Sequence, residues 1–321
     1  MILPTYLVPQ QRKRLYNHKT AKYLITDPVT MEIDGVVHKF GYLDVTKDIP
    51  STRKTWVDAL RLMKTPADFA NVRPLLEGLK RAHRALPRAM QHRIIRWTDA
   101  RHEGLQVIID AARAVKHTGF ALSSSELVAQ LLVALQGRAI AGGWAAADET
   151  RRALKRVREV LEMIESDEAH APGPEDAGAY PFHRDPQMLA YQLHLVAAVA
   201  VHEHGGADNR GVVAQHAAEL VGLWPEGKGL LDLQPDEAYA PEGRMHYLLD
   251  RNIYLWYAAP VLNALRMAAA VVEEPELAAK LRSRAENVEE EVKAALESPE
   301  RRKGGRGEWM YNTLLNPQAK A

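Results

Sequence analysis

Apolar residues recur along most of this chain at the three- and four-residue spacing of a buried helical stripe. The first regular stripe consists of Leu105, Ile108, Ile109, Ala112 and Val115. His117-Thr118-Gly119 predicts the end of that helix, because glycine readily takes the left-handed conformation that closes a helix. Ser124 or Ser125 predicts the start of a second helix, which Gly142-Gly143 closes.

A third helix is expected from about Ala146 to Glu165, with one apolar and one basic face. Its inward positions are Leu154, Val157, Leu161 and Ile164. Its outward positions are Arg151, Arg152, Lys155, Arg156 and Arg158. Apolar stripes of this width need neighbours to cover them, so we expect these helices to stack as antiparallel pairs.

The N-terminal part of the chain carries a different pattern. Residues 29–45 give the clearest strand signal, and Asp34-Gly35 supplies the positive φ angles of a two-residue hairpin turn. From about residue 50 the pattern is helical. Helix starts are expected at Ser51 or Thr52, at Thr65-Pro66 and at Val72, with breaks at Pro74 and Pro87.

Two further helix pairs are expected in the C-terminal half, over 186–203 with 211–223 and over 245–272 with 276–296. Pro260 should kink or divide the first helix of the last pair. These helix pairs recur in units of about 35–45 residues, which indicates a mainly α fold. We expect an irregular antiparallel helix-pair array of the repeat or solenoid-like kind, with a small N-terminal β-hairpin. The expected parts are a basic arm and hairpin (1–50), a basic helical domain (51–165), a Pro/Gly/acid-rich linker (166–185), an acidic helical-pair domain (186–298) and a basic tail (299–321).

Composition narrows the class of protein. The 321 residues are 46% hydrophobic and include no cysteine, which excludes disulfides, thiolate zinc sites and cysteine nucleophiles. The longest apolar stretches fall short of the roughly 20 residues that cross a bilayer, so no membrane partner is expected. The absence of cysteine fits a reducing or matrix-type compartment.

The net charge of +1 conceals two halves of opposite sign. Residues 1–160 carry 27 Lys and Arg against 15 Asp and Glu, a net charge of +12, and residues 161–321 carry 15 against 26, a net charge of −11. A basic half attracts polyanions, whereas an acidic half repels them and suits basic protein partners. The pattern therefore predicts an adaptor that contacts RNA through its first half and proteins through its second.

The densest basic band lies at residues 80–102. Its candidate RNA-binding residues are Lys80, Arg81, Arg84, Arg88, Arg93, Arg96 and Arg101, with Trp97 placed to stack on a base. Lys80, Arg84 and Arg88 would share one helical face, provided that Pro87 does not bend the helix. The alternative is a solvated helical face, balanced by the acidic half of the same chain.

Smaller basic clusters extend this interpretation. The further candidate RNA-binding residues are Arg12, Lys13, Arg14, Lys19 and Lys22 in the arm, Arg152 and Arg156 in the third helix, and Arg301, Arg302 and Lys303 in a glycine-containing tail. The arm also has the composition of an organellar transit segment. Pro4 and Pro9 interrupt the amphipathic helix that a transit segment needs, which favours the arm.

Catalysis is not indicated. His202-Glu203-His204, with His194 eight residues earlier, invites a metal site, but residues two apart on a helix diverge by about 200° and do not converge on one ion. Phosphate-binding glycine loops and the GxSxG nucleophile motif are absent from the sequence. We therefore expect no metal, no cofactor and no catalytic residue.

Two resemblances follow from these residues. The stretch Ile108–Leu135, IIDAARAVKHTGFALSSSELVAQLLVAL, resembles the junction between successive units of pentatricopeptide and related helical-repeat proteins. The basic arm, hairpin, helical pairs and acidic C-terminal half together resemble accessory proteins of the mitochondrial ribosome, of the fungal small-subunit type. That resemblance implies a non-catalytic protein of the mitochondrial matrix, held on ribosomal RNA and neighbouring proteins of a large assembly. The alternatives are an organellar RNA-processing or translation factor, an all-α enzyme and a protein-only helical scaffold.

Overall fold

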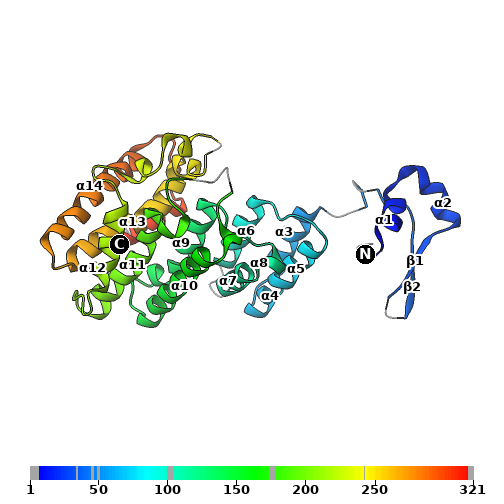
Figure 1. Ribbon diagram of the computed structural model, residues 1–321, viewed down its shortest axis with the longest axis horizontal. Helices are drawn as coiled ribbons and strands as arrows, with labels where there is room; N and C mark the ends of the chain where they lie inside the picture. The colour runs from blue at the N-terminus through cyan, green and yellow to red at the C-terminus, as the bar shows by residue number, and fades with distance from the viewer. Residues whose placement is uncertain are drawn as a thin grey trace. The chain divides into compact units, whose positions relative to one another are not determined.

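The fold is that of a computed structural model, which describes residues 7–33, 35–44, 47–48, 51–99, 104–173, 178–241 and 243–316 (Figure 1). Its internal contacts divide it into two units. The first unit extends to Thr65 and also takes in Arg81–Arg84, and the second contains the remaining described residues.

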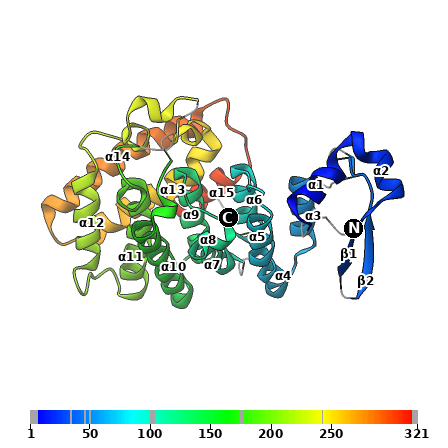
Figure 2. The same ribbon diagram turned by 45° about the vertical axis from the view of Figure 1, so that its right-hand side comes forward.

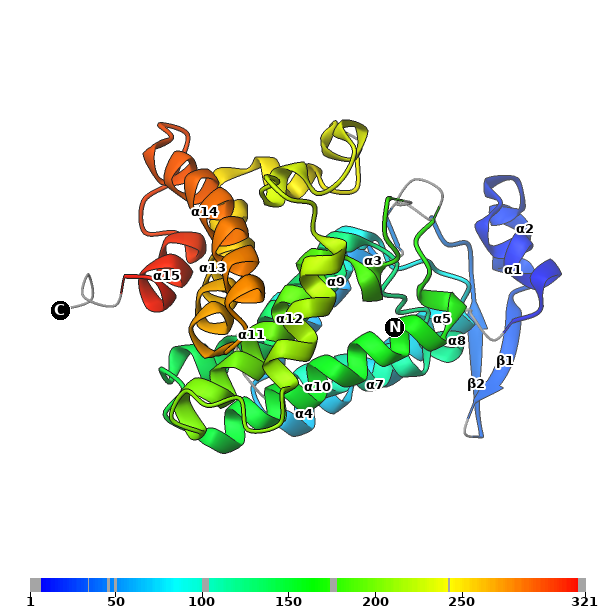
Figure 3. The ribbon, with the colours of Figure 1, turned by 60° about the vertical axis from the view of Figure 1, so that its left-hand side comes forward.

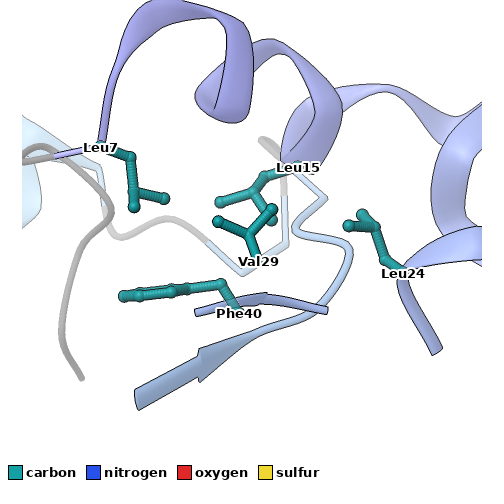
Figure 4. Packing of buried hydrophobic residues seen from close by; sticks show 5 residues of the cluster. All are labelled: Leu7, Leu15, Leu24, Val29 and Phe40. Atoms are coloured by element: carbon teal, nitrogen blue, oxygen red, sulfur yellow. The ribbon is translucent and has the colours of Figure 1, made fainter. Parts of the chain in front are cut away.

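The first unit is a small module built from short elements. They are α1 (Pro9–Tyr16), η2 (His18–Thr20), α2 (Ala21–Thr26), β1 (Val29–Ile33), β2 (Val36–Phe40) and α3 (Thr52–Leu62). The strands are antiparallel and pair Val29 with Phe40 and Ile33 with Val36, which confirms the predicted hairpin. Five buried side chains form the core of this module, namely Leu7, Leu15, Leu24, Val29 and Phe40 (Figure 4).

The segment expected to be a basic arm is therefore folded over its described residues. Pro9 stands at the first position of α1, where its missing N–H and fixed φ suit a helix start. Leu15 and Leu24, on α1 and α2, anchor the two helices to the hairpin. Proline thus begins a helix here instead of breaking one.

The described residues of the second unit form helices joined by loops and turns. Its elements are α4 (Pro66–Ala70), α5 (Val72–Arg81), α6 (Arg88–Asp99), α7 (Leu105–Arg113), α8 (Val115–Thr118), α9 (Ser125–Ala141), α10 (Ala147–Ser166), η3 (Glu168–His170), η5 (Phe182–Arg184), α11 (Pro186–Glu203), α12 (Val212–Leu223), η6 (Leu230–Asp232), η7 (Asp236–Tyr239), η8 (His246–Leu249), α13 (Arg251–Val271), α14 (Pro275–Glu297) and α15 (Arg306–Leu314). The mainly α fold with one small hairpin confirms the predicted class.

Two helices, α9 and α11, lie at the centre of the second unit. Most residues of each are buried, because α9 packs against α6 and α10, and α11 packs against α10, α12 and α13 (Figures 1 and 3). A helix that is apolar all round needs such neighbours on several sides. The remaining large contacts join α13 to α14 and to α15.

Several predicted helix ends agree with the structure, but the break predicted at Pro74 is wrong, because Pro74 lies in the first turn of α5. Gly119 closes α8 with a φ of 69°, and Ser124 caps α9 by accepting a hydrogen bond from the Leu127 N–H at 3.3 Å. Gly142 follows the last residue of α9. Pro260, in contrast, lies inside an unbroken α13, so the predicted division of that helix is wrong.

Leu154 corrects one prediction about α10. Val157, Leu161 and Ile164 are buried as expected, but Leu154 is only half-buried and lies among the arginines of the surface. The helical stripe that holds it contains Arg151 and Arg158, three residues before and four after.

We expect Gly119→Ala to lower the free energy of unfolding of the second unit by about 1 kcal/mol. An alanine would have to hold the left-handed conformation, and its Cβ would come within 3.2 Å of Lys80 Cδ. Urea unfolding measures the change. The matched control is Gly78→Ala in α5, where the added Cβ meets nothing within 4 Å, and that change should stabilise the helix. Equal effects of the two substitutions would contradict the argument.

A buried polar cluster joins α11 to the segment before α13. Asp185 caps α11 by accepting a hydrogen bond from the Gln187 N–H at 2.9 Å, and its other oxygen accepts from Arg244 at 3.1 Å and from the Gln234 amide at 2.9 Å. Burial raises the pKa of Asp185 to about 6, against the opposing charge of Arg244. Gly178 leaves the space for the guanidinium, because a Cβ there would overlap Arg244.

Candidate nucleic-acid interface

The basic face of α10 surrounds a hollow of about 700 Å³. The helix periodicity places Arg152, Lys155 and Arg156 together on this face. The residues that line the hollow are Gln106, Arg151, Arg152, Leu154, Lys155, Arg156, Arg158, Glu159 and Glu162. Eight of them have polar side chains, and five of these are cations that can reach a phosphate or a base edge through their N–H groups.

The charges around this hollow are only partly compensated. Arg113 of α7 forms an ion pair with Glu159, which neutralises one of the two acids in the lining. Arg152 lies 3.7 Å from Glu149 and is largely exposed. In the described part of the chain, Lys155 and Arg158 have no carboxylate within 4.0 Å. The hollow therefore keeps positive charge that a polyanion can reach.

Gln106 orients one of these cations. The Arg156 Nε donates a hydrogen bond to Gln106 Oε1 at 3.1 Å, and the Gln106 amide in turn donates to Asp110 Oδ1 at 3.2 Å. The guanidinium of Arg156 is thus held by one edge, which leaves its other N–H groups for a phosphate. Sequence patterns could not reveal the role of Gln106, because it lies 50 residues before Arg156.

The basic band at residues 80–102 does not form one helical face. Lys80 and Arg81 end α5, Arg84 lies in the connection, and Arg88 begins α6. Pro87 directly precedes α6, so the helical segment is interrupted at the predicted proline. The predicted shared face of Lys80, Arg84 and Arg88 is therefore wrong.

The residues of this band belong to both units. Arg81 and Arg84 belong to the first unit, whereas Lys80, Arg88, Arg93, Arg96 and Trp97 belong to the second. Arg84 donates a hydrogen bond from Nη1 to Thr52 Oγ1 at 3.1 Å. Arg96 is exposed, Arg93 and Trp97 are half-buried, and Arg101 lies outside the described residues.

The basic C-terminal segment is a docked helix and not a loose tail. Arg306 begins α15, which packs against α13 (Figure 2). The Arg306 guanidinium lies 4.6 Å from the ring centre of Trp256 and 2.9 Å from Asp99 Oδ2. Gly307 packs so closely on α13 that a Cβ would overlap the Asn252 carbonyl oxygen. Of the predicted RNA-binding residues here, Arg302 and Lys303 are exposed.

Arg301 is already engaged within the protein. Its side chain is 13% exposed, lies 3.0 Å from Glu308 and donates to the Leu296 carbonyl at 2.9 Å. These contacts fix the chain between α14 and α15. The glycines next to it suggested a flexible segment, but they serve a turn, since Gly304 has a φ of 73°.

The five candidate RNA-binding residues of the arm differ in their exposure. Arg12 is half-buried, and Arg14 forms an ion pair with Asp27 at 3.0 Å. Lys13, Lys19 and Lys22 are exposed.

The histidines of α11 have structural partners. His194 is fully buried, with Nδ1 at 2.7 Å from Gln136 Oε1 and Nε2 at 2.9 Å from the Asn263 amide. Burial, and the charge of His202, lower the pKa of His194 to about 3, so the ring is neutral and links α9, α11 and α13. The described residues include no group of three or more potential metal ligands. They also include no helix long and apolar enough to cross a membrane.

Fold and surface together define a mainly helical protein with exposed clusters of cations. Comparison with known proteins identifies its family. The family model for mitochondrial ribosomal protein mS27 matches residues 1–313. The small ribosomal subunit protein mS27 of Neurospora crassa is 39% identical over 313 residues, covering 92% of this chain and 78% of the relative. The chain therefore belongs to the mitochondrial ribosomal protein mS27 family.

Family membership decides between the alternatives that the sequence left open. The chain is a structural protein of the mitochondrial small ribosomal subunit, and not an enzyme. This confirms the predicted resemblance to fungal-type accessory proteins of that subunit. It also confirms a ribonucleoprotein component and a mitochondrial location.

Proposed function

We propose that this chain holds ribosomal RNA through the basic face of α10 and contacts neighbouring proteins through its acidic C-terminal half. The observation that carries the RNA contact is the hollow on α10, where Arg152 and Lys155 are exposed and Lys155 lacks a carboxylate partner among the described residues. Guanidinium and ammonium groups so placed suit phosphates, and such contacts position RNA without reading its sequence.

The remaining candidate residues extend the proposed RNA surface. Exposure supports a contribution from Lys13, Lys19 and Lys22 in the first unit and from Arg96, Arg302 and Lys303 in the second. The partners of Arg301 within the protein support a structural role for it instead. We also propose the mitochondrial matrix as the compartment, since a cysteine-free chain suits a reducing environment.

The proposed protein contact rests on α14. This helix exposes Glu276, Glu286, Glu290 and Glu297, and only Glu276 among these has an ion-pair partner among the described residues, Lys280. Glu286 and Glu290 are one turn apart and share a face. Such a face attracts the basic segments of neighbouring proteins and repels RNA.

Site-specific photo-crosslinking in the assembled small subunit tests both contacts. A photoreactive residue in place of Lys155 should crosslink to ribosomal RNA, and the same residue in place of Glu290 should crosslink to protein. Both positions are exposed, so the substitutions should leave the fold intact. Crosslinks from position 155 to protein alone would contradict the proposed RNA contact.

A further inference from the structure

A second hollow, of about 490 Å³, lies beside the first, on the other side of the Arg151, Leu154 and Arg158 stripe. It is bounded by α10, α11 and the start of α12, which pack in that order (Figure 3). We call it the α10–α12 groove. Its lining residues are Arg151, Leu154, Arg158, Val196, Val199, Ala200, His204, Asp208, Asn209, Arg210, Val212 and Val213.

The groove combines aliphatic side chains with cations. Leu154, Val199 and Val212 are half-buried, so each leaves apolar surface in contact with water. Arg151 and Arg158 flank Leu154 on α10, and the exposed Arg210 stands opposite, just before α12. Aliphatic surface between cations is the complement of a segment in which acidic residues flank apolar ones.

The charges of the groove are not balanced from within the described chain. Arg151 donates to Glu203 Oε2 at 2.7 Å, but Arg158 and Arg210 have no carboxylate of a described residue within 4.0 Å. Asp208 is the only acid among the described residues that line the groove, and its Oδ2 accepts a hydrogen bond from the Ala214 N–H at 2.9 Å. Two cations are thus left for an outside carboxylate.

We infer that the α10–α12 groove docks an acidic amphipathic segment of a neighbouring protein in the small subunit. RNA fits it less well, because no Phe, Tyr or Trp is among the described residues that line it, and unpaired bases bind proteins largely by stacking on such rings. Apolar side chains of a protein partner would also bury Leu154, Val199 and Val212, and this burial stabilises the complex. A sugar-phosphate backbone is polar and does not provide such burial. The inference rests on membership of the subunit and not on the RNA contact proposed above.

Photo-crosslinking from Val199 in the assembled small subunit tests this inference. The photoreactive residue should crosslink to one ribosomal protein, at a segment where Asp or Glu residues flank apolar ones. Position 212 serves as a second site if the first variant unfolds. Crosslinks to ribosomal RNA would overturn the inference. It would also be overturned if neither position 199 nor position 212 crosslinks while position 290 does. Position 155 reports the RNA contact separately, so the two proposals can fail independently.

Arg210→Glu supplies the matched test of charge. The Arg210 side chain is exposed and has no carboxylate partner among the described residues, so the fold should tolerate the substitution. Thermal unfolding of the variant checks that it does. We expect the crosslink yield from position 199 to fall about tenfold, which corresponds to roughly 1.4 kcal/mol of lost binding. Lys116→Glu, an equal charge change at an exposed position of α8, should leave the yield unchanged. An unchanged yield with Arg210→Glu would overturn the inference.

Discussion

Replacing Asp185 with alanine should lower the free energy of unfolding of the second unit by about 3–5 kcal/mol. The change leaves the Arg244 guanidinium buried without its carboxylate, and an uncompensated buried charge is among the costliest single defects in a protein. It also removes the N-cap of α11, which contributes about 1 kcal/mol more. Guanidinium unfolding, followed by the fluorescence of the buried Trp224, measures the loss.

Two variants separate the charge from the other contacts of Asp185. Asp185→Asn keeps an oxygen for the Gln187 N–H, so it should lose less stability than Asp185→Ala. Glu276→Ala breaks the exposed pair with Lys280 on α14 and should change stability very little. If Asp185→Ala unfolds no more easily than Glu276→Ala, the buried pair does not hold α11 in place.

The pH dependence of the same variants has a definite sign. The folded-state pKa of Asp185, about 6, lies above its usual value of 3.8. Between these two pH values Asp185 is protonated in the folded protein and ionised in the unfolded chain. The contribution of this side chain to stability therefore falls as the pH rises from about 4 to about 6. Stability of the wild-type protein relative to Asp185→Asn should decrease across that window.

Local sequence signals predicted the helix ends because those ends depend on nearby residues. Gly119, Ser124 and Gly142 act through their own backbone or through a hydrogen bond three residues away. The short helices α1 and α2 escaped prediction for the opposite reason. At 8 and 6 residues they are too short to display a period, and tertiary contacts of Leu15 and Leu24 hold them.

Long-range partners explain what the sequence could not reveal about the sites. Asp185 ends a stretch of polar and small residues, yet it is fully buried because Arg244 reaches it from 59 positions later. Leu154 was predicted to face the core from its spacing alone. Its exposure follows from the groove that α11 and α12 form beside it.

Reversing three charges on α10 should weaken binding to small-subunit ribosomal RNA by about two orders of magnitude at low salt. The variant is Arg152→Glu, Lys155→Glu and Arg156→Glu, which converts three proposed phosphate contacts into repulsions. Each lost contact should also lower the slope of log K against log salt concentration by about 0.7–0.9, so the slope should fall by about 2–3. Titration of labelled RNA between about 50 and 200 mM salt measures both quantities.

A control of equal charge decides whether the effect belongs to this face. Lys280→Glu, Arg282→Glu and Lys293→Glu change the net charge by the same amount but lie on exposed positions of α14, in the acidic half. If RNA is held at α10, the control should keep most of the affinity and nearly the whole salt slope, because exposed charges farther away than a Debye length are largely screened. A control that weakens binding as much as the α10 variant would mean that overall charge, and not the basic face of α10, attracts the RNA.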